Sequence, residues 1–132
     1  MERRLMLLDT HMFMWWLADE PSLSKADREE IENAEELFVS AASYWEIATK
    51  HRIGKLPDGP KYLLSGKDLT RLGIEALAVD AEDAKAAGLL KWEHQDPFDR
   101  MLVCQARHRR IRLLTNDKVV HRWLAHHGRD DL

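Results

Sequence analysis

Two short apolar runs near opposite ends of the chain each lead to an aspartate. Residues 5–8 end at Asp9, and residues 111–114 lead through two polar residues to Asp117. Both runs have the length of a buried β-strand, and a helical pattern follows each of them. Ligands of open parallel sheets bind at the carboxyl ends of the strands. The sequence therefore predicts two carboxylates on one edge of a parallel sheet.

Two further acids extend this set. A helical wheel places Glu46 on a helix with almost no polar face, and it places Asp99 on the inward side of a later helix. Carboxylates that share one place repel each other and lose hydration, so such a cluster usually persists because a cation lies within it. The four acids together predict a site for a divalent metal ion.

Each of these acids also has a structural interpretation. Asp9, Asp96 and Asp117 stand where a helix N-cap is expected, and Asp96 directly precedes a proline at the first helical position. Glu46 fits both a capping-box spacing and an i,i+4 ion pair on its own helix. For Asp96 the cap is the first interpretation and a metal-site role the second. For Asp9 and Asp99 a functional role is the better interpretation.

Strand-length and helix-length segments alternate through the sequence. We expect strands at about 3–8, 37–39, 76–79 and 111–114, and helices at 10–17, 24–34, 40–53, 61–72, from 80 onward, at 97–109 and at 118–125. This alternation predicts an α/β fold with a mainly parallel sheet. A length of 132 residues corresponds to about one domain, so we expect a single domain over 1–132 with a frayed tail at about 126–132.

Composition narrows the class of protein. The net charge of −3, from 20 Lys and Arg against 23 Asp and Glu, gives no overall attraction to nucleic acid, so such binding would need a local basic patch. Cys104 is the one cysteine, which excludes an internal disulfide and fits a reducing cytoplasm. No apolar run approaches the roughly 18 residues that span a bilayer, and the first apolar run is too short for a signal peptide.

Four blocks of the sequence resemble the signature blocks of PIN-domain proteins, and most closely those of the VapC-like toxins of bacterial toxin–antitoxin pairs. The blocks are Leu7–His11, Ser43–Ala48, Asp96–Leu102 and Leu114–Asp117. They occur in the order found in the family and extend over most of the chain. Together they are specific, whereas the Leu-Asp-Thr of the first block alone would not be.

The resemblance implies a three-layer α/β/α sandwich and Mg²⁺- or Mn²⁺-dependent cleavage of RNA. It also implies that the family's site residues correspond to Asp9, Glu46, Asp99 and Asp117, with Thr115 as the hydroxyl beside them. Asp96 belongs to the third block but is not one of the usual four acids, so we treat it as a further candidate ligand. Hard divalent cations prefer such oxygen ligands.

Basic residues near the acids are candidates for contacts to RNA. Lys50, Arg52 and Lys118 follow acid-bearing segments and could contact the RNA backbone. Residues 107–110 are also basic, but they are better explained as a solvated helix end, where positive charge favours the helix dipole.

Partners are predicted from the apolar helix at residues 12–17 and from the five tryptophans of the chain. Tryptophan and methionine are favoured at interfaces, so we expect a homodimer and, under the resemblance, an antitoxin helix on an apolar groove. Two alternative classes stay open. One is a phospho-acceptor receiver-like module, although such a module would carry paired acids after its first strand. The other is a catalytically silent PIN-like binding module.

Overall fold

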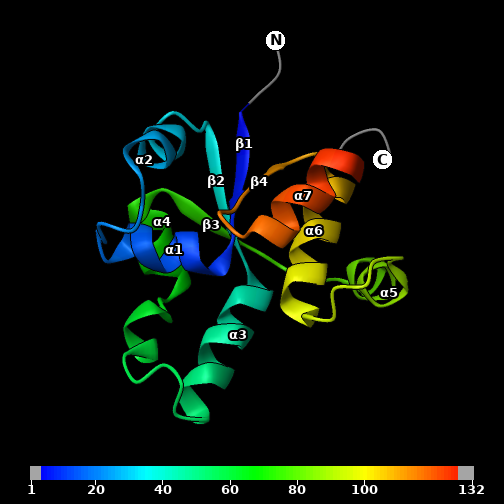
Figure 1. Cartoon of the computed structure of the whole chain (residues 1–132). Helices are drawn as coiled ribbons and strands as arrows, with labels where there is room; N and C mark the ends of the chain where they lie inside the picture. Colours follow the sequence, from blue (N-terminus) through cyan, green and yellow to red (C-terminus); the bar gives the residue numbers. More distant parts are fainter. Residues whose placement is uncertain (1–3, 128–132) are drawn as a thin grey trace.

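The computed structural model describes residues 4–127, and its elements alternate along the chain (Figure 1). The strands are β1 (Leu5–Leu8), β2 (Glu36–Ser40), β3 (Ile74–Leu77) and β4 (Arg112–Leu114). The helices are α1 (Thr10–Leu17), α2 (Lys25–Glu32), α3 (Ala41–Arg52), the 3₁₀ helix η1 (Gly59–Tyr62), α4 (Gly66–Leu72), α5 (Ala81–Leu89), α6 (Pro97–Arg109) and α7 (Lys118–His127).

The four strands form one parallel sheet in the order β3-β2-β1-β4. In Figure 1 the helices α1, α2 and α4 lie on one face of the sheet, and α6 and α7 lie on the other. α5 packs against the outer side of α6. The expected three-layer α/β/α sandwich with a parallel sheet is therefore confirmed.

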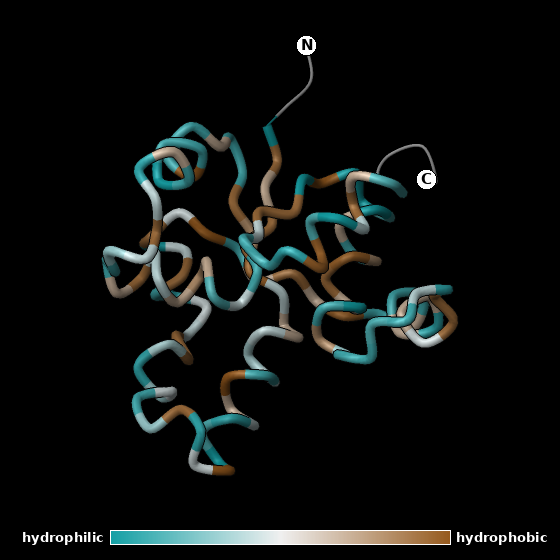
Figure 2. The backbone as a smooth tube through the Cα atoms, viewed as in Figure 1, coloured by the Kyte–Doolittle hydropathy of each residue, from teal (hydrophilic) through white to brown (hydrophobic). Residues whose placement is uncertain are grey.

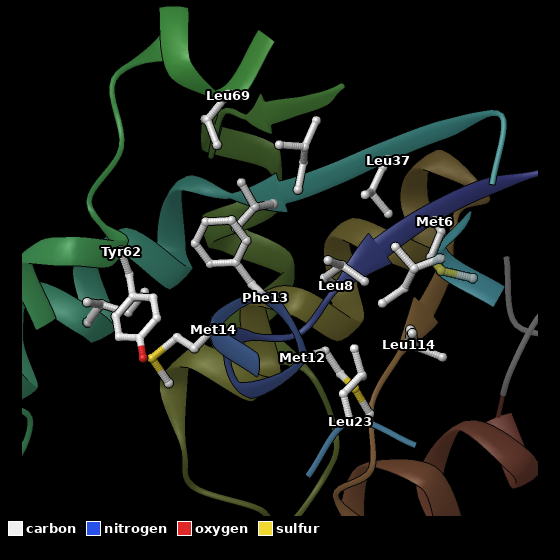
Figure 3. Packing of buried hydrophobic residues seen from close by; sticks show 14 residues of the cluster. Met6, Leu8, Met12, Phe13, Met14, Leu23, Leu37, Tyr62, Leu69 and Leu114 are labelled. Carbon is white, nitrogen blue, oxygen red and sulfur yellow. The ribbon is translucent and has the colours of Figure 1, made fainter. Parts of the chain in front are cut away.

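Alternate side chains of β1 serve two separate cores. Met6 and Leu8 pack with Phe13 of α1 on one face (Figure 3), whereas Leu7 packs with Leu102 and Val103 of α6 on the other. Side chains of a strand point alternately to the two sides, so one apolar run supplies both layers. Figure 2 shows the same arrangement, because hydrophobic segments concentrate at the sheet while α2 is largely hydrophilic.

Most predicted elements differ from the structure by one or two residues at an end, and two differ more. The helix expected over 61–72 is instead the 3₁₀ helix η1 followed by α4, because Ser65 starts a new helix by accepting a hydrogen bond from the Asp68 backbone. The strand expected at 76–79 is β3, which begins two residues earlier. Gly73, with a φ of +78°, ends α4 in the left-handed region and lets Ile74 enter the sheet at once.

The ends of the chain differ slightly from the sequence prediction. α7 continues to His127, past the expected end at residue 125, and the rest of the predicted frayed tail lies outside the described residues. Residue 3, which we included in the first strand, also lies outside them. Within residues 4–127, no helix is long and apolar enough to cross a membrane.

The order of the strands places the topological switch point of the sheet at the carboxyl end of β1. The chain continues from β1 to β2 and β3 on one side, and it later places β4 on the other side of β1. Helices that follow neighbouring strands on opposite faces leave room between them at this position. Figure 1 shows the starts of α1, α3, α6 and α7 gathered near these strand ends.

Candidate active site

Asp9 lies at the end of β1 and is the N-cap of α1. Its Oδ1 accepts a hydrogen bond of 2.8 Å from the Met12 backbone, and only 8% of the residue is exposed. Burial raises the pKa of this carboxyl, although hydrogen bonds from Thr115 and Met12 oppose the rise, and the nearby charge of Glu46 adds to it. The cap and the functional role predicted for Asp9 are thus compatible, since Oδ2 takes no part in the cap.

Thr115 connects two of the predicted acids. Its buried hydroxyl donates a hydrogen bond of 2.5 Å to Oδ2 of Asp9 and accepts one of 3.1 Å from the Asp117 backbone. Asp117 caps α7, because its Oδ1 accepts hydrogen bonds from the backbones of Val119 and Val120. The side chain of Asp117 is exposed.

Glu46 lies on α3 and is 6% exposed. Its Oε2 accepts a hydrogen bond of 2.6 Å from Nζ of Lys50, so the predicted i,i+4 pair is present. The helix itself is capped by Ser40, which rules out a capping box from Ser43. Ser43 accepts instead a buried hydrogen bond of 2.9 Å from Thr10, and this contact joins the starts of α3 and α1.

Asp99 lies in the first turn of α6 and is partly buried. Burial raises the pKa of its carboxyl; a hydrogen bond from His94 opposes the rise, while the charges of Asp96 and Asp117 add to it. The bond joins Nε2 of His94 to Oδ2 of Asp99 at 2.7 Å. Asp99 therefore has Asp96 and Asp117 as negatively charged neighbours, and Asp9 has Glu46.

Asp96 is the N-cap of α6, as the sequence predicts. Its Oδ1 accepts hydrogen bonds of 2.8 Å from Phe98 and 3.2 Å from Asp99. Ligand atoms of His94, Asp96 and Asp99 also lie within 4.8 Å of one another, a spacing at which three side chains could share one metal ion. The capping role of Asp96 occupies one carboxylate oxygen and leaves the other available.

His94 was missed by the sequence analysis. It lies in the segment between α5 and α6, and only the closeness of that segment to Asp99 reveals its position. Arg100 was missed as well: its guanidinium donates hydrogen bonds to the carbonyl oxygens of Leu90, Trp92 and His94 in this segment and to that of Ala87 in α5. The one signal for Arg100 in the sequence was its place as a basic residue directly after Asp99. Arg100 holds the segment that carries His94 against α6.

The three predicted RNA contacts have different environments. Lys50 is paired with Glu46, whereas Arg52 at the end of α3 and Lys118 at the start of α7 are exposed. Arg109, which we interpreted as part of a solvated helix end, instead forms a two-fold ion pair with the buried carboxylate of Asp83 at 2.7 and 2.8 Å. Only tertiary packing of α5 on α6 could show this pair.

Glu46 is thus a charged neighbour of Asp9, and Asp96 and Asp117 are charged neighbours of Asp99. Among the described residues, the acids close enough to share one ion are Asp96 and Asp99, together with His94. Thr115 connects Asp9 with Asp117 through its bonds to the Asp9 carboxylate and to the backbone of Asp117. The donor set consists mainly of carboxylate oxygens with one imidazole, which suits hard divalent cations such as Mg²⁺ and Mn²⁺. That these side chains are the ligands stays a prediction.

The chain belongs to the PIN domain family, whose pattern it matches over residues 6–123. A parallel sheet with acids at the carboxyl ends of β1 and β4 is the arrangement that the sequence blocks led us to expect. This membership does not favour the receiver-like alternative.

Several proteins that are similar to this chain are VapC or VapBC proteins. Ribonuclease VapC22 of Mycobacterium tuberculosis is 30% identical over 112 residues, which cover 85% of this chain and 86% of that protein. Among solved structures, the sarcin-ricin loop cleaving toxin VapC20 of M. tuberculosis superposes with a TM-score of 0.64 at 13% identity, covering 89% of this chain and 94% of that one. VapBC2 of Rickettsia felis, bound to a promoter DNA fragment, gives 0.61 at 17% identity, with 89% and 91% covered.

Proposed function

We propose that this protein is a metal-dependent endoribonuclease and acts as the cytoplasmic toxin of a toxin–antitoxin pair. The observation that carries the proposal is the burial of two acids, Asp9 and Glu46, with the charge of Glu46 adding to the rise in the pKa of Asp9. The 30% identity to Ribonuclease VapC22 supports the choice of RNA as substrate. Carboxylates that lose hydration and repel each other are costly, so a functional cation is their simplest explanation.

Asp9, Asp99, Asp117 and Glu46 would hold Mg²⁺ or Mn²⁺, with Asp96 as a further candidate. The bound ion would supply Lewis-acid stabilisation of the charge on the phosphodiester and would activate water as the nucleophile. The residues present fit this role, because Oδ2 of Asp9 and one oxygen of Asp96 are not used by the helix caps.

Hydrogen bonds from other side chains of the protein would hold these carboxylates in fixed positions before the reaction. Thr115 orients the Asp9 carboxylate, and Lys50 holds the Glu46 carboxylate in a fixed position. His94 fixes Oδ2 of Asp99. A preorganised charge distribution needs little reorganisation during the reaction, which is how such sites lower a barrier. Lys118 and Arg52 would bind phosphates of the RNA on either side of the site.

The direct test is incubation of purified protein with total cellular RNA, with Mn²⁺ or Mg²⁺ and with EDTA, followed by sequencing of the new RNA ends. We expect discrete cleavage that EDTA abolishes and that Asp9→Asn and Asp99→Asn both lack, while circular dichroism shows an intact fold. Undiminished cleavage by the folded Asp99→Asn protein would mean that the site is misassigned.

We also propose a homodimer and a cognate antitoxin. Trp15 and Trp16 on α1 pack against the first core but keep part of their surface exposed, so they could contribute to an interface. A basic side chain of the antitoxin could enter the acid cluster, because a cation relieves its repulsion. Analytical ultracentrifugation tests the dimer, and purification from the native host tests the antitoxin. A strictly monomeric protein without a copurifying partner would contradict both.

A further inference from the structure

Trp45 is unusually exposed for a tryptophan. It lies on α3 with 64% of its surface exposed, and it is the one aromatic residue among the large hydrophobic side chains exposed in residues 4–127. Burial contributes little to stability at this exposure, because the hydrophobic effect scales with the apolar area removed from water. The position of Trp45 therefore calls for a different explanation.

The ring of Trp45 meets the ring of Phe98 from α6. Their centroids are 5.1 Å apart and their planes form an angle of 80°, which is an edge-to-face contact. Trp45 directly precedes Glu46, and Phe98 directly precedes Asp99. Consecutive Cα atoms are about 3.8 Å apart, so the aromatic pair adjoins an acid on each helix. The pair thus joins the two helices that carry these predicted site residues.

A cation continues this surface along α3. Arg52 follows Trp45 by two helical turns, which places it on the same side of the helix at roughly 10 Å. It is exposed, and no hydrogen bond or ion pair to it is found in the part of the chain that the structure describes. Lys50, by contrast, is occupied by Glu46. The exposed side of α3 therefore carries an aromatic ring and, two turns further on, a positive charge.

We propose that Trp45, supported by Phe98, stacks an unpaired nucleobase of the RNA substrate next to the phosphate that is cleaved, while Arg52 contacts a neighbouring backbone phosphate. The inference rests on the proposed ribonuclease function and adds a subsite to it. Every base has a π-face, so stacking on an aromatic side chain favours single strands over duplexes with little dependence on sequence. The substrate is accordingly single-stranded at the cleavage position.

The surroundings of Trp45 favour RNA over a protein helix as the occupant. A helix bound in a groove needs a continuous apolar stripe. The next residues on this side of α3 are Ala48, Thr49 and Arg52, which offer little apolar area and a positive charge. Ile53, 51% exposed, lies two turns away from Trp45. An aromatic ring flanked by a free cation matches the alternation of bases and phosphates in a nucleic acid strand.

The test measures RNA binding without cleavage, in protein that carries Asp9→Asn. The variants are Trp45→Ala, Trp45→Phe and Arg52→Gln, with Leu89→Ala as the control, since Leu89 is 81% exposed on α5. The probes are a single-stranded RNA oligonucleotide of ten residues and a duplex of the same sequence. We expect Trp45→Ala to weaken single-strand binding about ten- to hundredfold, Trp45→Phe to weaken it less, and the control to change nothing.

Fluorescence supplies a second readout that does not depend on the alanine variant folding. Stacking of a base should quench the tryptophan emission on RNA addition, and the Trp45→Phe protein should lose most of that quenching. Equal single-strand affinity for Trp45→Ala and Leu89→Ala, or unchanged quenching in Trp45→Phe, would overturn the inference. A Trp45→Ala protein that loses only the binding of its antitoxin and keeps its affinity for RNA would overturn it as well. Failure of the proposed function is distinguishable, because the protein with native Asp9 would then cleave no RNA at all.

Discussion

Thr115 at the end of β4 donates a hydrogen bond of 2.5 Å to Asp9 at the end of β1, although the two residues are 106 positions apart in the sequence. The pairing of the strands explains this contact. Leu8 lies opposite Leu114, and the backbone N–H of Asp9 donates to the carbonyl of Leu114. The residues that follow them, Asp9 and Thr115, therefore lie side by side. The register of β1 on β4 thus sets the geometry of the site.

Asp9→Asn should abolish RNA cleavage and at the same time stabilise the metal-free fold. Burial raises the folded-state pKa of Asp9, so its contribution to stability is fully present below the pKa of the unfolded chain and is lost as pH rises through the raised folded pKa. At neutral pH the ionised carboxylate therefore opposes folding, and Asn removes this charge while retaining a cap. Thermal unfolding of both proteins is measured in EDTA from pH 4 to pH 8. The melting temperature of the variant should exceed that of the native protein most at high pH.

The addition of Mn²⁺ provides the control for this prediction. The native protein should gain in melting temperature on Mn²⁺ addition, because an ion that binds only the folded state stabilises it. The Asp9→Asn protein should gain much less. An Asp9→Asn protein less stable than the native one in EDTA at pH 7 would contradict the electrostatic account.

Thr115→Val should reduce cleavage by about tenfold or more and also lower stability. The valine keeps the shape of the side chain but removes the donor to Asp9 and the acceptor for the Asp117 backbone. Loss of a buried partner of this kind typically costs about 1–3 kcal/mol of unfolding free energy. Thr115→Ser retains the hydroxyl and should keep most of the activity. Steady-state kinetics and urea unfolding of the two variants provide the comparison.

Asp99→Asn and Asp96→Asn should separate a ligand from a cap. Asp99→Asn should abolish cleavage and weaken Mn²⁺ binding measured by calorimetry. Asp96→Asn should keep most of the cleavage and most of the Mn²⁺ binding if Asp96 is only a cap, and it should keep the stability because Asn caps nearly as well as Asp. Asp96→Ala should lose about 1 kcal/mol of unfolding free energy. Loss of Mn²⁺ binding in Asp96→Asn, without loss of stability, would identify Asp96 as a ligand.

Arg100→Lys should loosen the segment between α5 and α6. A lysine ammonium has three donors at one point and cannot reproduce the four bonds of Arg100 to Ala87, Leu90, Trp92 and His94. Hydrogen exchange of residues 90–96 should speed up in the variant. Cleavage should fall with it, since His94 would no longer be held against Asp99. Unchanged exchange would show that the stacking of Trp92 on Trp123 suffices to hold the segment.

Acid should destabilise the contact between α5 and α6. The Asp83 carboxyl is buried, which opposes ionisation, but bonds from Arg109, the Asp80 backbone and Gln105 outweigh burial and lower its pKa to about 2. A depressed pKa contributes stability that is present above the unfolded pKa and is lost as pH falls through the folded value. This group should therefore contribute roughly 2 kcal/mol above pH 4, which disappears toward pH 2.

Unfolding of an Asp83→Asn variant between pH 2 and pH 7 measures this contribution. The variant should be less stable than the native protein at pH 7 and approach it at pH 2. Asp68→Asn is the matched control, because the ion pair of Asp68 with Arg71 is exposed at 3.5 Å and should contribute little. If the free energy of unfolding fell by the same amount from pH 7 to pH 2 in Asp83→Asn and in the native protein, the prediction would be contradicted.

The positions of the acids along the chain were predictable because their causes are local. Asp9 follows an apolar run with the length of a buried strand, and Asp96 precedes a proline that suits the first position of a helix. The i,i+4 pair of Glu46 with Lys50 was likewise visible, since a helix brings these positions together by its own geometry. Each of these statements depends on fewer than about ten neighbouring residues.

The sequence by itself determined the alternation of strands and helices, the acids at their ends and hence the class of fold, because hydrophobic period and capping preferences act over one or two turns of chain. Only the tertiary structure decided that β4 lies beside β1, so that Thr115 reaches Asp9, and that His94 reaches Asp99. It also decided that Trp45 meets Phe98. These contacts depend on strand order and on the packing of helices from separate parts of the chain, and no local pattern of residues encodes such distances.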